Sequence, residues 1–240
     1  MTVTSVSSAE TSPAAPPRIG HAIAVGAAGF AWCSLALGLS TVGAMNTVGS
    51  SMILAGTFFY GGIVQLVAGF FALAAGTTFV AAFLTAYGAF WLGYTAIQVY
   101  VAPHIVAQVM SAGAGTGASQ AALGAQAGHD VVQALGVFLI AWLVVTVIFT
   151  VASLGTNAVT LGAFLLLDLT IVLLAVAYLG ASSAGAPVSS TLHAAGWVEI
   201  VLAAVAFYVV LAELANETLR RTVFPLFPLT RFTASTASSV

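Results

Sequence analysis

The sequence predicts an all-α integral membrane protein, built as a bundle of six transmembrane helices with both termini in the cytoplasm. Three observations support this prediction. First, 61% of the 240 residues are hydrophobic and only 4% are charged, whereas a soluble domain carries about 25% charged residues. Second, the apolar residues gather in six runs, each near the roughly 20 residues that a membrane-spanning helix needs. Third, the few basic residues are all arginines, and they lie outside these runs.

The six apolar runs follow one another along the chain and predict one helix each. Their bounds are His21–Gly43, Val48–Ala74, Phe79–Val101, Val131–Ser153, Asn157–Gly180 and Leu192–Leu214. Residues 102–130, between the third and fourth runs, are mostly small and polar, so we expect a flexible loop outside the membrane. Residues 1–20 are rich in Ser, Thr, Ala and Pro, which predicts a disordered cytoplasmic tail. Residues 215–240 are expected to form a cytoplasmic C-terminal tail.

The arginines predict the orientation of the bundle. Arg18 precedes the first run, and Arg220, Arg221 and Arg231 follow the last one. Because basic residues concentrate on the cytoplasmic side of a membrane, both ends are expected inside, which agrees with an even number of spans. We therefore expect a multi-pass protein of the cell membrane, plasma or inner.

Composition also excludes several classes of partner. The formal net charge of −2 excludes a basic nucleic-acid surface. No Cys/His cluster has the spacing of a zinc site, so neither a metal nor a cofactor is expected. The predicted spans contain no Lys or Arg, which disfavours phosphates and nucleotides as solutes, because these groups are held by arginine clamps. A small, weakly charged or neutralised solute fits the remaining hydroxyls, amides and acids.

One face of the second run carries Gly61, Gln65 and Gly69 at positions i, i+4 and i+8. Two interpretations stand: a seam of small residues where helices pack, with Gln65 as a hydrogen bond between helices, or a face that lines a pore. Tyr60 adjoins this face and is a further candidate for a solute path. In the third run, Trp91 is expected at the membrane interface, where tryptophan is enriched.

Titratable residues occur deep in the last two runs. Asp168 is the only charged residue between Asp130 and Glu199, and a carboxylate at the centre of a bilayer costs about 2.5–3.5 kcal/mol. Glu199 lies deep in the last run and is a candidate for the solute path or for proton coupling. His193, near the outer end of that run, is a further candidate, although such a residue is more often hydrogen-bonded at the interface.

Three stretches of the chain resemble one known family. They are FYGGIVQLVAG (Phe59–Gly69), GTTFVAAFLTAYGAFWL (Gly76–Leu92) and HAAGWVEIVLAAVAFYVVLAELANETLRRTVFP (His193–Pro225). Together they resemble the acetate uptake transporter family, also called the succinate–acetate permease or GPR/FUN/YaaH family. The resemblance implies a ring-like homo-hexamer with a path through each protomer. It also implies acetate or a related short monocarboxylate as the solute, moved by proton-coupled uptake or by channel-like passage.

The resemblance also implies positions for the path. A constriction is expected at Phe30, Tyr87 and Leu169. The family's entrance motif, Asn-Pro-Ala-Pro-Leu-Gly-Leu, falls on residues 21–27, which read HAIAVGA. Here His21 replaces the asparagine and only Gly26 is retained, so the entrance is expected at these two residues and the range of substrates is expected to differ.

Asp168 precedes Leu169, and this position suggests a mechanism of coupling. Burial disfavours the charged form of a carboxyl group, and a protonated Asp168 can donate a hydrogen bond to a carboxylate and release its proton inside. The alternative is a neutral, structural acid that is hydrogen-bonded between helices.

Three other functions compete with proton-coupled uptake. The first is a passive channel for acetate or another small anion, and the second is a non-transporting scaffold or sensor. The third is a membrane enzyme, suggested faintly by GASSAG (Gly180–Gly185) and His193. Ser182 lies in a predicted turn with no base placed to activate it, so we do not expect an enzyme.

Overall fold

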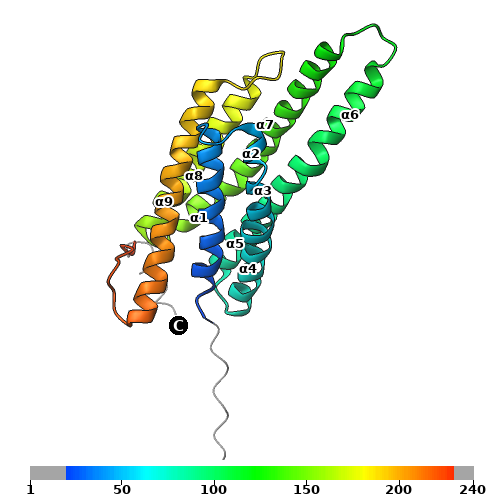
Figure 1. The fold of residues 1–240 in the computed structure, drawn as a ribbon. Coiled ribbons are helices and arrows are strands. Elements are labelled where there is room, and N and C mark those ends of the chain that lie inside the picture. The colour runs from blue at the N-terminus through cyan, green and yellow to red at the C-terminus, as the bar shows by residue number, and fades with distance from the viewer. Residues whose placement is uncertain (1–19, 230–240) are drawn as a thin grey trace, which may run out of the picture.

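The computed structural model describes residues 20–229, which form a bundle of long helices that lie roughly side by side (Figure 1). Within this range the only strand-like pairing is an isolated bridge between Asn157 and Pro228. Six helical segments are long and apolar enough to cross a membrane, which confirms the predicted number of spans. They are Ala22–Thr41, Val48–Ala74, Thr78–Gly113, Gln120–Ser153, Ala158–Leu179 and Ser189–Leu219. The predicted N-terminal tail lies, up to residue 19, outside the described residues.

Four of the spans are single helices, and the other two are composite. The single helices are α1 (Ala22–Thr41), α7 (Gln120–Ser153), α8 (Ala158–Leu179) and α9 (Ser189–Leu219). The second span consists of α2 (Thr47–Ser50), α3 (Ile53–Gly56), the π-helical segment η1 (Thr57–Val64) and α4 (Gln65–Ala74). The third consists of α5 (Thr78–Ala96), the π-helical segment η2 (Ile97–Val101) and α6 (Ala102–Gly113).

Close packing of neighbouring helices holds the bundle together, with α1 along α9, α8 between α7 and α9, and α4 along α5 (Figure 1). Gly61, Gln65 and Gly69 are all buried on this packed side of the second span. A Cβ atom added at Gly61 would lie 2.9 Å from the Trp91 ring, and one at Gly69 would lie 2.5 Å from Cγ2 of Thr85. The face is therefore a small-residue packing seam, as in the first of the two interpretations above. The hydrogen bond that this interpretation expected from Gln65 is not formed, because neither polar atom of its side chain has a partner among residues 20–229.

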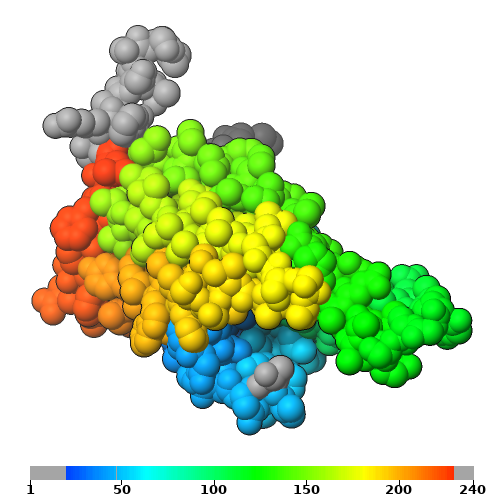
Figure 2. Space-filling view, turned by 90° about the horizontal axis from the view of Figure 1, so that it is seen from above, coloured from blue at the N-terminus to red at the C-terminus, as the bar shows by residue number. Residues whose placement is uncertain are grey.

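The expectation of a flexible loop over residues 102–130 is wrong for most of that segment. Helix α6 continues the third span to Gly113, and α7 begins at Gln120, where the Ser119 side chain accepts a hydrogen bond of 3.2 Å from the Ala122 amide. Only a short turn remains, and its Gly115 and Gly117 adopt positive φ angles. The α6–α7 hairpin protrudes from one side of the bundle, in green in Figure 2. Packing of two helices on each other outweighs the loop-like composition of this segment.

The C-terminal region also differs from the expectation, because α9 extends beyond residue 214 to Leu219. Arg220 then takes a left-handed conformation, and the chain turns back along the bundle. The Asn216 side chain accepts hydrogen bonds from the amides of Val223 and Phe224. The Leu229 amide donates to the Thr156 carbonyl in the α7–α8 turn. Residues 221–229 therefore form a strap across one end of the bundle rather than a free tail.

Candidate functional site

An apolar cavity of about 60 Å³ lies between α1, α5, α8 and α9. This volume has room for a few water-sized groups, at roughly 10–15 Å³ each. Its lining contains no charged side chain, and Thr160 and Tyr87 are its only residues with a polar side-chain group. Its wall includes Ala27, Phe30, Phe83, Tyr87, Phe164, Leu167, Leu202 and Ala206.

Phe30 of α1 and Tyr87 of α5 meet at this cavity. Their ring centroids are 5.4 Å apart and their planes are inclined by 72°, an edge-to-face contact. Tyr87 is only 2% exposed, and its hydroxyl lies 2.6 Å from Oγ1 of Thr146 on α7. Because the Thr146 hydroxyl donates to the Trp142 carbonyl, the Tyr87 hydroxyl is the donor. The two rings form an aromatic pair in the cavity wall, with the tyrosine held in place from α7, and the constriction of a solute path at this pair stays a prediction.

The third expected constriction residue, Leu169, does not join this pair. Its side chain is 45% exposed on the outside of the protomer, and it is absent from the cavity lining. Leu167, two positions earlier and so about 200° away around the helix, lies in the cavity wall instead. The expectation is corrected accordingly: α8 contributes Leu167 and Phe164 to the cavity.

Asp168 points neither into the cavity nor freely to the outside. Its Oδ2 accepts a hydrogen bond of 2.6 Å from the Thr150 hydroxyl on α7, and it is absent from the cavity lining. The Thr150 backbone in turn accepts a hydrogen bond from Ser153. The other carboxyl oxygen, Oδ1, is buried and has no partner among residues 20–229. The acid therefore bridges α8 to α7, which is the arrangement of the structural alternative.

Glu199 is buried inside the bundle with a relative exposure of 4%. It lies on α9, three residues before the cavity residue Leu202. Its Oε2 has no hydrogen-bond partner in the described part of the chain. Gln65 is fully buried, and neither its amide nitrogen nor its oxygen has a described partner.

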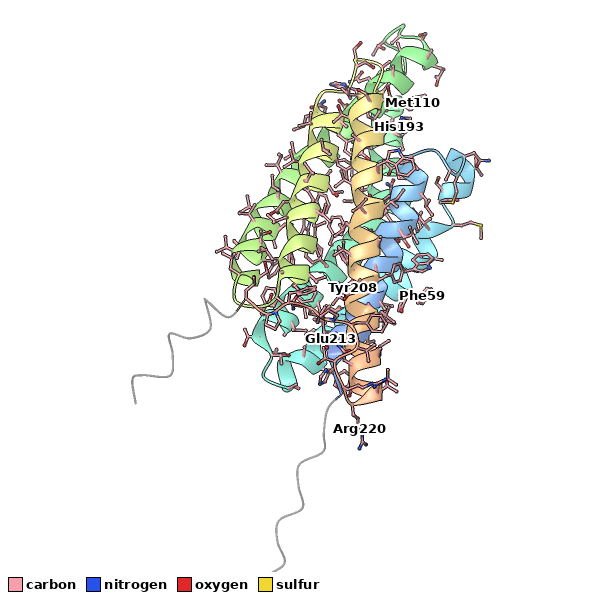
Figure 3. The ribbon with its side chains drawn as sticks, turned by 90° about the vertical axis from the view of Figure 1, so that its left-hand side faces the viewer. Phe59, Met110, His193, Tyr208, Glu213 and Arg220 are labelled. Atoms are coloured by element: carbon pink, nitrogen blue, oxygen red, sulfur yellow. The ribbon has the colours of Figure 1, made fainter. Side chains whose placement is uncertain are left out.

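The remaining expected path residues lie at the periphery. Tyr60 is 36% exposed on η1. His193 is exposed near the end of α9 that is opposite to Glu213 (Figure 3). Neither residue lines the cavity.

The two expected entrance residues lie at the start of α1. His21 is the N-cap residue, and its Nδ1 lies 3.4 Å from Oε2 of Glu213 on α9. Gly26 is buried, and a Cβ atom there would lie 2.5 Å from a methyl group of Leu84. Gly26 therefore allows α1 and α5 to approach each other closely, and His21 joins the first span to the last.

Sequence reasoning missed one functional candidate in particular. Trp91 was expected at the membrane interface, but it is 2% exposed in the interior, 6.3 Å from the Phe30 ring between centroids. Its indole Nε1 is buried without a described partner. The only signal in the sequence was its spacing, one helical turn after Tyr87, which places both rings on the same side of α5.

These features define a multi-pass helical membrane protein whose spans surround an apolar cavity lined by aromatic side chains. The family model described as the GPR1/FUN34/yaaH family matches residues 4–231, and the chain belongs to this family.

Known proteins of similar sequence and structure agree with this assignment. The "Succinate-acetate/proton symporter SatP" of Escherichia coli K12 is 30% identical over 209 residues, covering 87% of this chain and 96% of its own. The "Acetate permease A" of Emericella nidulans is 30% identical over 195 residues, covering 80% of this chain but only 61% of its own length. The solved structure of "the bacterial acetate channel SatP" superposes with a TM-score of 0.67 at 29% identity, covering 87% of this chain and 99% of that one.

Proposed function

We propose that the protein moves acetate or a related short monocarboxylate across the cell membrane, by a path through each protomer. The observation that carries this proposal is the uncharged cavity lined by Phe30 and Tyr87, in a family whose named relatives include an acetate permease and an acetate channel. A cavity without a cation suits a solute with one charge that a proton can neutralise. Succinate, with two charges, is expected to be the poorer substrate.

The direction of coupling we propose is uptake together with protons, as in the symporter relative. The orientation that the arginines predict, with both termini in the cytoplasm, is part of the proposal, as is assembly into a homo-hexamer. The position of Asp168 between α7 and α8 favours a structural hydrogen bond to Thr150 over a role as the proton carrier. Passive passage is the second candidate, and it is favoured by the description of the similar solved structure as a channel.

The deciding experiment is uptake of labelled acetate into proteoliposomes, with and without an inward proton gradient. Liposomes without protein are essential, because acetic acid crosses bilayers unaided. Accumulation above equilibrium that depends on the protein supports symport, and equilibration without accumulation supports a channel. Absence of any protein-dependent flux overturns the proposed function. Competition by unlabelled propionate that is stronger than competition by succinate is the expected order of preference.

The hexamer is tested separately by the mass of the purified protein in lipid nanodiscs. A mass of a single protomer in a native-like bilayer contradicts this part of the proposal without affecting the substrate.

A further inference from the structure

Glu199 is an acid without a visible counter-charge. Its side chain is 4% exposed and Oε2 has no described partner. The sequence contains no Lys or Arg between Arg18 and Arg220, and the only ion pair among residues 20–229 joins His21 to Glu213 at one end of the bundle. An unpaired buried carboxylate is strongly unfavourable, so Glu199 either holds a proton or shares one with a ligand.

The groups that face Glu199 come from each of the helices around it. Cys33 of α1, Tyr94 of α5 and Tyr178 of α8 all lie near enough to interact electrostatically with its carboxyl group. All three are weak acids that are neutral near pH 7, and none supplies positive charge. The two tyrosine hydroxyls can both donate hydrogen bonds.

Trp91 adds a further hydrogen-bond donor next to Tyr94. Its ring centroid lies 6.1 Å from that of Tyr94 and 6.3 Å from that of the constriction residue Phe30. The indole N–H is buried with no described acceptor. A buried donor without an acceptor is unfavourable, so this N–H is available to an acceptor that the described residues do not provide. We call Glu199, Trp91, Tyr94 and Tyr178 the Glu199 cluster.

The chemistry of the cluster selects among possible ligands. A small cation could neutralise Glu199, but it would bring no acceptor for the Trp91 N–H. A carboxylate brings two acceptor oxygens, and neutral N–H and O–H donors are present to receive its charge. Two carboxyl groups in contact in a low-dielectric interior hold one proton between them, because they cannot both ionise. A protonated Glu199 and an incoming carboxylate therefore form a pair with one proton and one negative charge.

We propose that the Glu199 cluster is a binding site for the carboxylate of the transported solute, adjoining the Phe30–Tyr87 pair through the Phe30–Trp91 contact, and that Glu199 holds this carboxylate through a shared proton. This inference rests on the proposed function and assigns the solute a specific site. No covalent bond forms or breaks, and the shared proton either stays with Glu199 or leaves with the acid.

The test is binding and uptake of labelled acetate by the full chain in nanodiscs and proteoliposomes, for the parent, Glu199→Gln, Trp91→Phe and Glu217→Gln. Glu217 lies on the same helix but is exposed, so its variant is the matched control. Glu199→Gln keeps a neutral donor but removes the proton that the two carboxyl groups share, and replacing this charge-assisted bond by a weaker one predicts acetate affinity lower by about tenfold. Trp91→Phe keeps the ring and removes only the N–H, and a loss of about fivefold is expected. Glu217→Gln should equal the parent.

The pH dependence separates a binding role from a purely structural one. Parent affinity for acetate should fall as pH rises and Glu199 loses its proton, whereas Glu199→Gln should lose this dependence. The inference is overturned if Glu199→Gln keeps the parent's affinity for acetate and its pH dependence. It is also overturned if ammonium competes with labelled acetate for binding and propionate does not. If the parent itself shows neither binding nor flux of acetate, the proposed function fails. If the parent transports and both variants transport equally well, only the inference fails. Thermal melting of each variant identifies a loss of acetate affinity that is due to misfolding. If Glu199→Gln is misfolded, the acetate affinity of Trp91→Phe tests the inference instead.

Discussion

Substitution of Gly29 by alanine tests whether the close approach of α1 to η1 positions the constriction. A Cβ atom at Gly29 would clash with the carbonyl oxygen of Tyr60 and lie 3.0 Å from its carbon. Because the backbone of Tyr60 cannot rotate out of the way as a side chain can, α1 has to shift away from η1. Overpacking costs about 1–3 kcal/mol, and a clash with backbone should cost about 2–3 kcal/mol of this range, while the better helix propensity of alanine offsets roughly 1 kcal/mol. We expect a net loss of roughly 1–2 kcal/mol in the free energy of unfolding.

Gly162→Ala is the matched control for this prediction. Gly162 is also helical, in α8, but nothing lies within 4 Å of its added Cβ, so the same substitution should stabilise by about 0.5–1 kcal/mol. Reversible unfolding of both variants in mixed micelles, monitored by circular dichroism, measures whether the free energy of unfolding falls in Gly29→Ala and rises in Gly162→Ala. Because Gly29 precedes Phe30, acetate flux should also change in Gly29→Ala and stay at the parent value in Gly162→Ala. Equal or greater stability of Gly29→Ala would refute the packing argument.

Three further predictions concern the polar residues and the constriction. Asp168→Asn should retain the uptake of the parent and its pH dependence, and loss of uptake that depends on pH in this variant would restore the coupling hypothesis. Thr150→Val should lower the free energy of unfolding by about 1–3 kcal/mol, because it leaves the Asp168 carboxyl group without a partner. Tyr87→Ala should open the constriction and raise flux of butyrate relative to acetate, measured in the same proteoliposomes, and an unchanged ratio would place the selective step elsewhere. His21→Ala should change stability by less than about 1 kcal/mol, because its pair with Glu213 is largely exposed; a larger change in chemical denaturation would show that the pair holds the first span to the last.

The division of the chain into six spans was predictable because hydrophobic length is a property of the sequence alone. A helix needs a minimum number of apolar residues to cross a bilayer, wherever its neighbours lie. The ends of the spans were less predictable. Residues 102–130 have the composition of a loop, yet α6 and α7 run through most of them. These residues are helical because the two helices pack against each other, as in the contact of Gly113 with Leu123, and this contact is visible only in the tertiary structure.

Sequence alone therefore determined the class of protein, the number of spans, the resemblance to one family, and the presence of Phe30, Tyr87 and two acids within the spans as candidates. Tertiary structure decided which way each of them points. On a helix that is apolar all round, every position looks equally suited to the interior, so nothing in the sequence separates Leu167 from Leu169. Packing against α5 and α9 placed Leu167 at the cavity, and it turned Asp168 toward α7. The same packing buried Glu199 and Trp91 beside the constriction, because side-chain direction depends on helix rotation, which only the neighbouring helices determine.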